Sequence, residues 1–150
     1  MTFAQEFAKN QGRPIVVNGH EVVPMVRCEV RPADRVRVVW RTVRAVPVQG
    51  IRIKVAGGKL ATAGQPDLSD IVLWSDTAPG DTVFVCRSKQ PVELRIWNCW
   101  RDQRGVMQAW VGNAGMRVVD SGNGSITVAC NARDEVTFAD LVFEVVCEER

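Results

Sequence analysis

The 150-residue sequence contains no tyrosine and a single histidine, His20. His20 follows the dipeptide Asn18-Gly19 of a predicted tight turn, where an exposed side chain is expected. A catalytic Ser-His-Asp triad would have to use this histidine, and its position beside the turn argues against that role. The sequence also lacks a G-x-S-x-G elbow, an H-E-x-x-H helix and a Walker-type phosphate loop. These absences favour a non-enzymatic protein, and we expect no metal or cofactor.

Long apolar runs are absent as well. No segment approaches the roughly 18 apolar residues of a membrane-spanning helix, and the first residues have no apolar stretch behind a basic start. The sequence therefore predicts a cytoplasmic protein that does not contact a membrane. Apolar residues make up 46% of the chain and charged residues 24%, which is ordinary for a folded protein. The length suits a single domain over residues 1–150.

The five cysteines include no C-x-x-C pair, and most lie inside or at the end of apolar runs. A free cysteine behaves as a small buried hydrophobic residue, so we expect free thiols in a reducing compartment. Disulfides and a metal site are the alternatives. The cysteines are Cys28, Cys86, Cys99, Cys130 and Cys147.

A short helix is expected at the start of the chain, within an arm over residues 1–13. Thr2 and Gln5 have the spacing of a capping box. Phe3 and Phe7 are four residues apart and therefore share one face of that helix.

Strands are expected throughout the rest of the chain. Apolar and charged residues alternate along Met25–Arg31, Arg35–Thr42 and Ile51–Val55, which is typical of half-buried strands in antiparallel sheets. Gly57-Gly58 is expected to interrupt the last of these. About nine or ten strands at spacings of roughly 8–12 residues predict an all-β fold. We expect an antiparallel two-sheet sandwich of jelly-roll or Greek-key type, with one short N-terminal helix.

Three of the five tryptophans fall in one predicted hairpin, whose strands Val92–Trp100 and Val106–Val111 flank residues 101–105. Trp97 and Trp100 are an odd number of residues apart, so they point to opposite faces and one is expected outside the main core. A hairpin symmetric about Gln103 would place Asn98 opposite Gln108 and put Trp100 and Trp110 on one face.

A tryptophan flanked by amides suits a sugar, which offers a flat apolar face and a few hydrogen-bonding groups. Asn113 lies in a predicted bulge or tight bend, where we expect it to bond mainly to backbone. Core packing of the tryptophans is the alternative. The candidate ligand-binding residues are Trp97, Asn98, Trp100, Gln108, Trp110 and Asn113.

Basic residues occupy the outward phase of three consecutive predicted strands. If these strands are neighbours, the cations form one surface that binds an anion or an acidic partner. No aromatic residue interleaves with them, which argues against a nucleic-acid platform, and a solvated sheet face is the alternative. The residues are Arg27, Arg31, Arg35, Arg37, Arg41, Arg52 and Lys54.

Four aspartates in predicted turns, Asp67, Asp70, Asp76 and Asp81, suggest turn chemistry or a calcium site. The leading functional hypothesis is a binding module for a carbohydrate or another polar ligand. The second is a structural protein that forms homo-oligomers or binds an acidic partner. The third is an enzyme that uses loop carboxylates or a cysteine.

Overall fold

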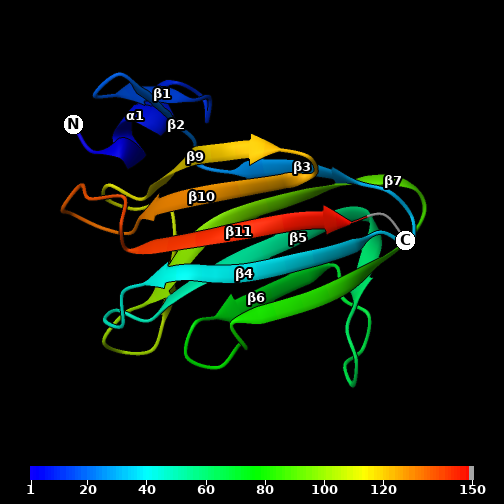
Figure 1. Cartoon of the computed structure of the whole chain (residues 1–150). Coiled ribbons are helices and arrows are strands. Elements are labelled where there is room, and N and C mark those ends of the chain that lie inside the picture. Colours follow the sequence, from blue (N-terminus) through cyan, green and yellow to red (C-terminus); the bar gives the residue numbers. More distant parts are fainter. Residues whose placement is uncertain (149–150) are drawn as a thin grey trace.

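The computed structural model describes residues 1–148 and confirms an all-β protein with one short N-terminal helix (Figure 1). Every strand pair in the described chain is antiparallel. The elements are α1 (Phe3–Lys9), β1 (Ile15–Val17), β2 (His20–Val22), β3 (Val26–Val30), β4 (Arg35–Val43), β5 (Gln49–Ala61), β6 (Asp70–Trp74), β7 (Asp81–Arg101), β8 (Met107–Gln108), β9 (Gly115–Gly122), β10 (Ser125–Asn131) and β11 (Leu141–Glu148).

The predicted arm over residues 1–13 is joined by the β1–β2 hairpin in one small unit at one corner of the molecule (Figure 1). This larger unit, α1 with β1 and β2, is called the arm from here on. The predicted capping box is confirmed: Thr2 Oγ1 accepts from the Gln5 backbone N–H, and Gln5 Oε1 accepts from the Thr2 backbone N–H. Phe3 and Phe7 are buried and pack against Val22 in a cluster separate from the main core. The arm therefore has its own hydrophobic contacts.

The nine-stranded sheet doubles over into two layers. Its strands follow the order β6-β5-β7-β4-β11-β10-β9, and β3 and β8 also pair with β7. Layer I contains β3, β6 and β8 with residues 49–56 of β5 and 92–101 of β7. Layer II contains β4, β9, β10 and β11 with the remaining halves of β5 and β7. The two longest strands thus belong to both layers.

The corner between the layers lies at Gly57-Gly58, where the sequence predicts an interruption. β5 instead continues through it and pairs with β7 on both sides of a register shift. Gly57 has φ +82°, and a Cβ on Gly58 would lie 2.9 Å from Ser88 Cβ. Glycine lets the ribbon bend because it tolerates positive φ and close backbone approach. The predicted strand Val92–Trp100 is accordingly only the second half of a longer strand, β7, which begins at Asp81.

The core lies between the two layers and follows the predicted alternation. Val26 and Val30, and Ile51 and Ile53, are buried from layer I, and Val36 and Val38 from layer II. Larger side chains fill the space between the two layers. This packing of two sheet layers face to face supports the predicted sandwich. These fully buried side chains include Leu60, Leu94, Ile96, Met116, Leu141 and Phe143.

All five cysteines lie in the described chain and are free, as expected. Cys86, Cys99 and Cys130 are buried, and Cys28 and Cys147 are half-buried. Within residues 1–148, no helix has the length and apolar character that crossing a membrane requires.

Candidate functional site

The tryptophan hairpin closes in a different register from the predicted one. Trp100 lies opposite Gln108 and Arg101 opposite Met107, and β8 is only two residues long. Asn98 consequently does not face Gln108, and its partner on β5 is Ile51. The loop after β7 sets the register through Asp102, because an aspartate oxygen readily accepts from nearby backbone N–H groups.

Asp102 is held by three hydrogen bonds. Its Oδ1 accepts from the backbone N–H groups of Arg104 and Val106, at 2.9 and 3.0 Å, and its Oδ2 accepts from Gln108 Nε2 at 3.0 Å. The bond from Val106, followed by that from Gln108, lowers the pKa of Asp102 below its usual value. Gln108 therefore stabilises the hairpin loop.

Trp97 and Trp100 point to opposite faces of β7, and both are only 4% exposed. Trp100 packs with Ala114 and Ala132 in a small cluster apart from the main core. Trp97 lies beneath Trp110, with the Arg52 guanidinium 5.6 Å from its ring centroid. Neither indole offers an open face.

Trp110 is the most exposed of the five tryptophans, at 44%. Its ring stacks on Trp97 with centroids 4.7 Å apart and planes inclined by 28°, and its Nε1–H donates to the Pro24 carbonyl at 2.9 Å. Its φ of +58° lies in the left-handed region, which costs a bulky residue on the order of 1–3 kcal/mol. The indole is thus exposed, oriented and held in a strained conformation.

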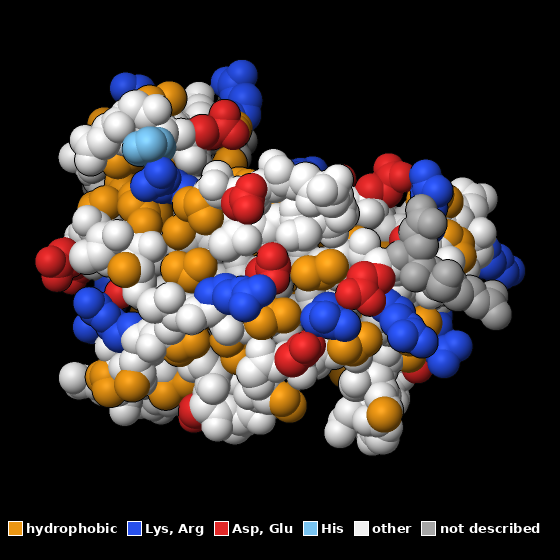
Figure 2. All heavy atoms as spheres, viewed as in Figure 1, with side chains coloured by type: hydrophobic (Ala, Val, Ile, Leu, Met, Phe, Trp, Pro, Cys, Tyr) orange, Lys and Arg blue, Asp and Glu red, His pale blue; other side chains and the backbone are white. Residues whose placement is uncertain are grey.

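One wall of a groove between the arm and the sandwich is formed by Trp110. This arm groove has a volume of about 350 Å³ and joins a second pocket of about 440 Å³ that shares Gly12, Pro24, Met25 and Arg27. Hydrophobic side chains gather where the arm meets the sandwich on the face seen in Figure 2. The residues that line the arm groove are Ala4, Phe7, Gln11, Gly12, Pro24, Met25, Arg27 and Trp110.

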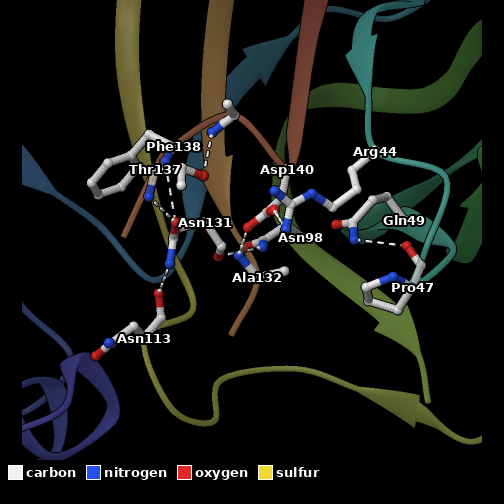
Figure 3. Close-up of polar contacts among 11 residues, drawn as sticks. Arg44, Pro47, Gln49, Asn98, Asn113, Asn131, Ala132, Thr137, Phe138 and Asp140 are labelled. Atoms are coloured by element: carbon white, nitrogen blue, oxygen red, sulfur yellow. Dashed lines mark hydrogen bonds and ion pairs between the residues drawn. The ribbon is translucent and has the colours of Figure 1, made fainter. Parts of the chain in front are cut away.

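The asparagines of the predicted site belong to an internal network (Figure 3). Asn98 Nδ2 donates to the Asn131 carbonyl at 3.0 Å, and Asn131 Nδ2 donates to the Asn113 carbonyl at 2.9 Å. Asn113 Oδ1 accepts from the Phe3 backbone N–H at 3.1 Å, and its Nδ2 donates to the Asp134 carbonyl at 2.7 Å. Asn113 bonds to backbone, as expected, and it ties the arm to the β10–β11 loop.

Asp140, which sequence reasoning missed, anchors the other side of this network. Its buried carboxylate pairs with Arg44 Nη1 at 3.1 Å and accepts from the Ala132 backbone N–H at 2.8 Å (Figure 3). Burial, and secondarily the charge of Asp140, raises the pKa of the Cys130 thiol well above its usual value. In the sequence, the one signal for this anchoring role is that Asp140 is an acidic residue directly before a strand.

The predicted basic surface is divided between the layers. β3 pairs with β7 rather than with β4, so Arg27, Arg52 and Lys54 lie in layer I while the β4 arginines lie in layer II. Cationic and anionic side chains alternate over β11 and β4 in Figure 2. The ion pairs are Arg27–Glu93, Arg37–Asp81, Arg37–Glu148, Arg41–Glu144, Arg52–Asp70 and Lys54–Asp70.

Arg31 and Arg35 are exposed and form no ion pair with any residue of the described chain. The other predicted basic residues are neutralised by neighbours, which leaves no continuous cationic face. Hydrogen bonding to Arg52 also lowers the pKa of Asp70, so this pair stays ionised.

The four turn aspartates do not converge. Asp67 pairs with Arg87, Asp70 with Arg52, Asp76 with Arg101 and Asp81 with Arg37. Among residues 1–148, no three His, Cys, Asp or Glu side chains are grouped as metal ligands. Each of these aspartates has a structural partner of its own.

Four loops meet at one end of the sandwich: residues 44–48, 75–80, 102–106 and 132–140 (Figure 1). They enclose the loop-end pocket, of about 790 Å³, which no sequence pattern indicated. Its lining residues are Ala45, Val46, Pro47, Val48, Asp76, Trp100, Arg101, Asp102, Gln103, Arg104, Gly105 and Arg133.

No protein-family model, curated protein or solved structure matches the chain. The arm groove, the loop-end pocket and the surfaces around them are the features of the molecule that bear on its function.

Proposed function

We propose that the protein is a non-enzymatic binding module whose arm groove binds a saccharide, or a polar ligand with a similar flat apolar face, against Trp110. The observation that carries the proposal is the exposed indole, fixed by Trp97 stacking and by its bond to Pro24. A side chain that is already ordered loses little conformational entropy when a ligand binds.

The groove combines apolar and polar walls. Phe7 and Met25 lie on its apolar side, while Gln11 and Arg27 provide hydrogen-bonding groups. Arg27 is paired with Glu93 at 3.4 Å, so its charge is partly neutralised. This composition favours a neutral polyhydroxylated ligand, whose C–H face stacks on the indole while its hydroxyl groups bond to the side chains.

The other predicted site residues support the platform. Trp97 lies beneath Trp110, and Trp100 is buried under the hairpin. Asn98, Gln108 and Asn113 use their amides within the protein. Among the six predicted residues, Trp110 is therefore the one we assign to direct ligand contact.

A glycan array with wild-type protein and Trp110→Ala tests this proposal. We expect the wild type to bind and Trp110→Ala to bind at least about tenfold more weakly, because stacking of a flat ligand group on an aromatic side chain contributes about 1–3 kcal/mol. Trp110→Gly removes the ring and the left-handed strain together, which separates lost contacts from backbone effects.

Val111→Ala is the matched control, because Val111 is similarly exposed but does not line the groove. A wild-type protein that binds no saccharide at millimolar concentration, or a Trp110→Ala variant with wild-type binding, would refute the proposal.

Self-association is a second candidate, favoured by the edge strand β9. Within residues 1–148, β9 pairs with β10 on one side, and its other side is bridged to Val23 at Met116. Beyond Met116, Val118 and Val119 are about half exposed. Exposed edge strands can pair with another chain. Sedimentation of the wild type and Val119→Lys at micromolar concentration tests this candidate. A wild-type dimer that is lost in the variant supports self-association, and a monomeric wild type eliminates it.

A further inference from the structure

We propose that the loop-end pocket is an oxyanion site that binds the phosphoryl or sulfuryl group of a ligand through Arg101, Arg104 and Arg133. This site is separate from the arm groove and does not depend on a saccharide binding there. The three arginines come from two different loops and the end of β7, and they line the same pocket.

Arg101 is held in place from two sides. It pairs with Asp76, and its guanidinium lies 4.9 Å from the centroid of the Trp74 ring. Its Nε is buried and has no hydrogen-bond partner among the described residues. Because Nε is shielded from solvent, a ligand in the pocket would meet Arg101 at the exposed part of its side chain, which is 30% accessible.

Arg104 and Arg133 carry the charge that the protein leaves uncompensated. Both are exposed, and neither forms an ion pair in the part of the chain that the structure covers. Their backbones are nevertheless fixed, because the Arg104 N–H donates to Asp102 Oδ1 at 2.9 Å and the Arg133 carbonyl accepts from the Asn113 N–H at 2.8 Å. The loops therefore fix the backbone from which each side chain extends, and the two guanidinium groups form no ion pair within residues 1–148.

The two carboxylates in the pocket do not cancel the charge of the three arginines. Asp76 is paired with Arg101, and Asp102 keeps its negative charge, which attracts Arg104, while it accepts from two backbone N–H groups and from Gln108. With three arginines against two aspartates, the lining carries one net positive charge, and neither Arg104 nor Arg133 is held in an ion pair within the described chain. The guanidinium group donates to two oxygens of a tetrahedral oxyanion at once, and such charge-assisted bonds are about twice as strong as neutral ones.

An apolar wall adjoins the arginines. Val46 and Pro47 line the pocket. A free inorganic ion would leave this wall unused, whereas an ester places its carbon group against it. The pocket therefore favours a phosphate or sulfate ester over the inorganic anion.

The test is a nuclear magnetic resonance titration that follows arginine Nε–Hε, tryptophan indole and backbone amide signals. Phenyl phosphate, phenyl sulfate, benzoate and benzyl alcohol are added at constant ionic strength, with inorganic phosphate in a further arm. We expect saturable shifts at Arg101, Arg104 and Arg133, and about tenfold weaker binding of benzyl alcohol because it makes no charge-assisted bond. The phosphate and sulfate esters show which oxyanion the site prefers.

The Arg104→Gln/Arg133→Gln double variant should weaken binding of the preferred ester by about tenfold or more. Arg31→Gln/Arg35→Gln is the matched control, because it removes two exposed arginines that also lack ion pairs in the described chain. Trp110→Ala should leave this titration unchanged, which separates the oxyanion site from the arm groove.

Three results would overturn the proposal: wild-type shifts that rise linearly without saturation, shifts centred on Arg31 and Arg35, or an equal loss of affinity in the control variant. The wild-type shift map decides the matter even if the double variant folds poorly.

Discussion

The arm groove and the loop-end pocket each include residues of the tryptophan hairpin but differ in the groups they leave free. In the arm groove an indole is exposed, while the single lining arginine, Arg27, is paired with Glu93. In the loop-end pocket the tryptophan is buried, while Arg104 and Arg133 are unpaired within the described chain. The kind of ligand that each region suits follows from which group the protein leaves without a partner.

Asn113 connects the two regions. Its side chain accepts from Phe3 in the arm and donates to Asp134, next to Arg133 of the loop-end pocket. The two sites thus differ in chemistry but share Asn113 as a structural support.

The largest expected effect comes from the buried rings beneath the two sites. Trp97→Ala and Trp100→Ala should each lower the free energy of unfolding by about 3–5 kcal/mol, because both leave a large cavity. Trp110→Ala should cost about 1 kcal/mol, since its ring is partly solvated and its loss leaves a surface gap. Urea unfolding measures all three, and a Trp110 cost equal to that of Trp97 would contradict this contrast.

Asn113→Ala should destabilise both regions together. It removes an acceptor for Phe3 and a donor for Asp134, so we expect a loss of about 2–3 kcal/mol. Hydrogen exchange should accelerate in both α1 and residues 132–140. Asn10→Ala is the control, because it removes a side-chain hydrogen bond, from Asn10 Nδ2 to the Pro14 carbonyl, that lies within the arm alone. If exchange in Asn113→Ala accelerates only in the arm, the two regions are independent.

Acidification should weaken the ion pairs that neutralise the sheet faces. Hydrogen bonds from Arg52 and Arg41 lower the pKa values of Asp70 and Glu144 respectively. A carboxyl whose pKa is lower in the folded state stabilises the protein above its unfolded pKa of about 4 and loses that contribution as the pH falls further. The effect is small because these pairs are exposed.

Urea unfolding at pH 7 and pH 3 provides the measurement. Arg52→Gln and Arg41→Gln should each lose less stability on acidification than the wild type does. Arg133→Gln, which removes an arginine that forms no ion pair in the described chain, should match the wild type, and a similar reduction in that variant would show that the pairing assignment is wrong.

The smallest expected effect concerns the thiols. Burial raises the pKa values of Cys28 and Cys99 to about 12, and it also raises those of Cys130 and Cys147. Because the thiolate is the reactive form, iodoacetamide at pH 8 should label the native protein slowly and label all five cysteines in denaturant. One rapidly labelled native cysteine would restore the hypothesis of a thiol enzyme.

The sequence predicted which side chains turn inward better than it predicted which strands are neighbours. Val26, Ile51 and Val36 are buried as the alternation requires, since burial of one strand face is a local property. Alternation contains no information on pairing, so the expectation that Arg27 and Arg37 share one surface failed when β3 and β4 were found in different layers.

The site was less predictable because it depends on loop geometry and long-range contacts. Asp102 shifts the hairpin register, which moves Gln108 opposite Trp100. The stacking of Trp110 on Trp97 requires a left-handed residue that no turn signal marks. The loop-end pocket brings together residues 45 and 133, whose proximity is a consequence of the whole fold.

The ribbon formed by β5 and β7 has a consequence for how the molecule assembles. Both strands cross the corner at Gly57-Gly58, so each layer contains one half of β5 and one half of β7. Layer I cannot be completed before Gln49 has met Trp100, and layer II cannot be completed before Val36 has met Cys147, which makes folding slow for a chain of this size. Once formed, the layers cannot separate as independent sheets, so we expect the most protected amides of both to exchange in a single cooperative opening.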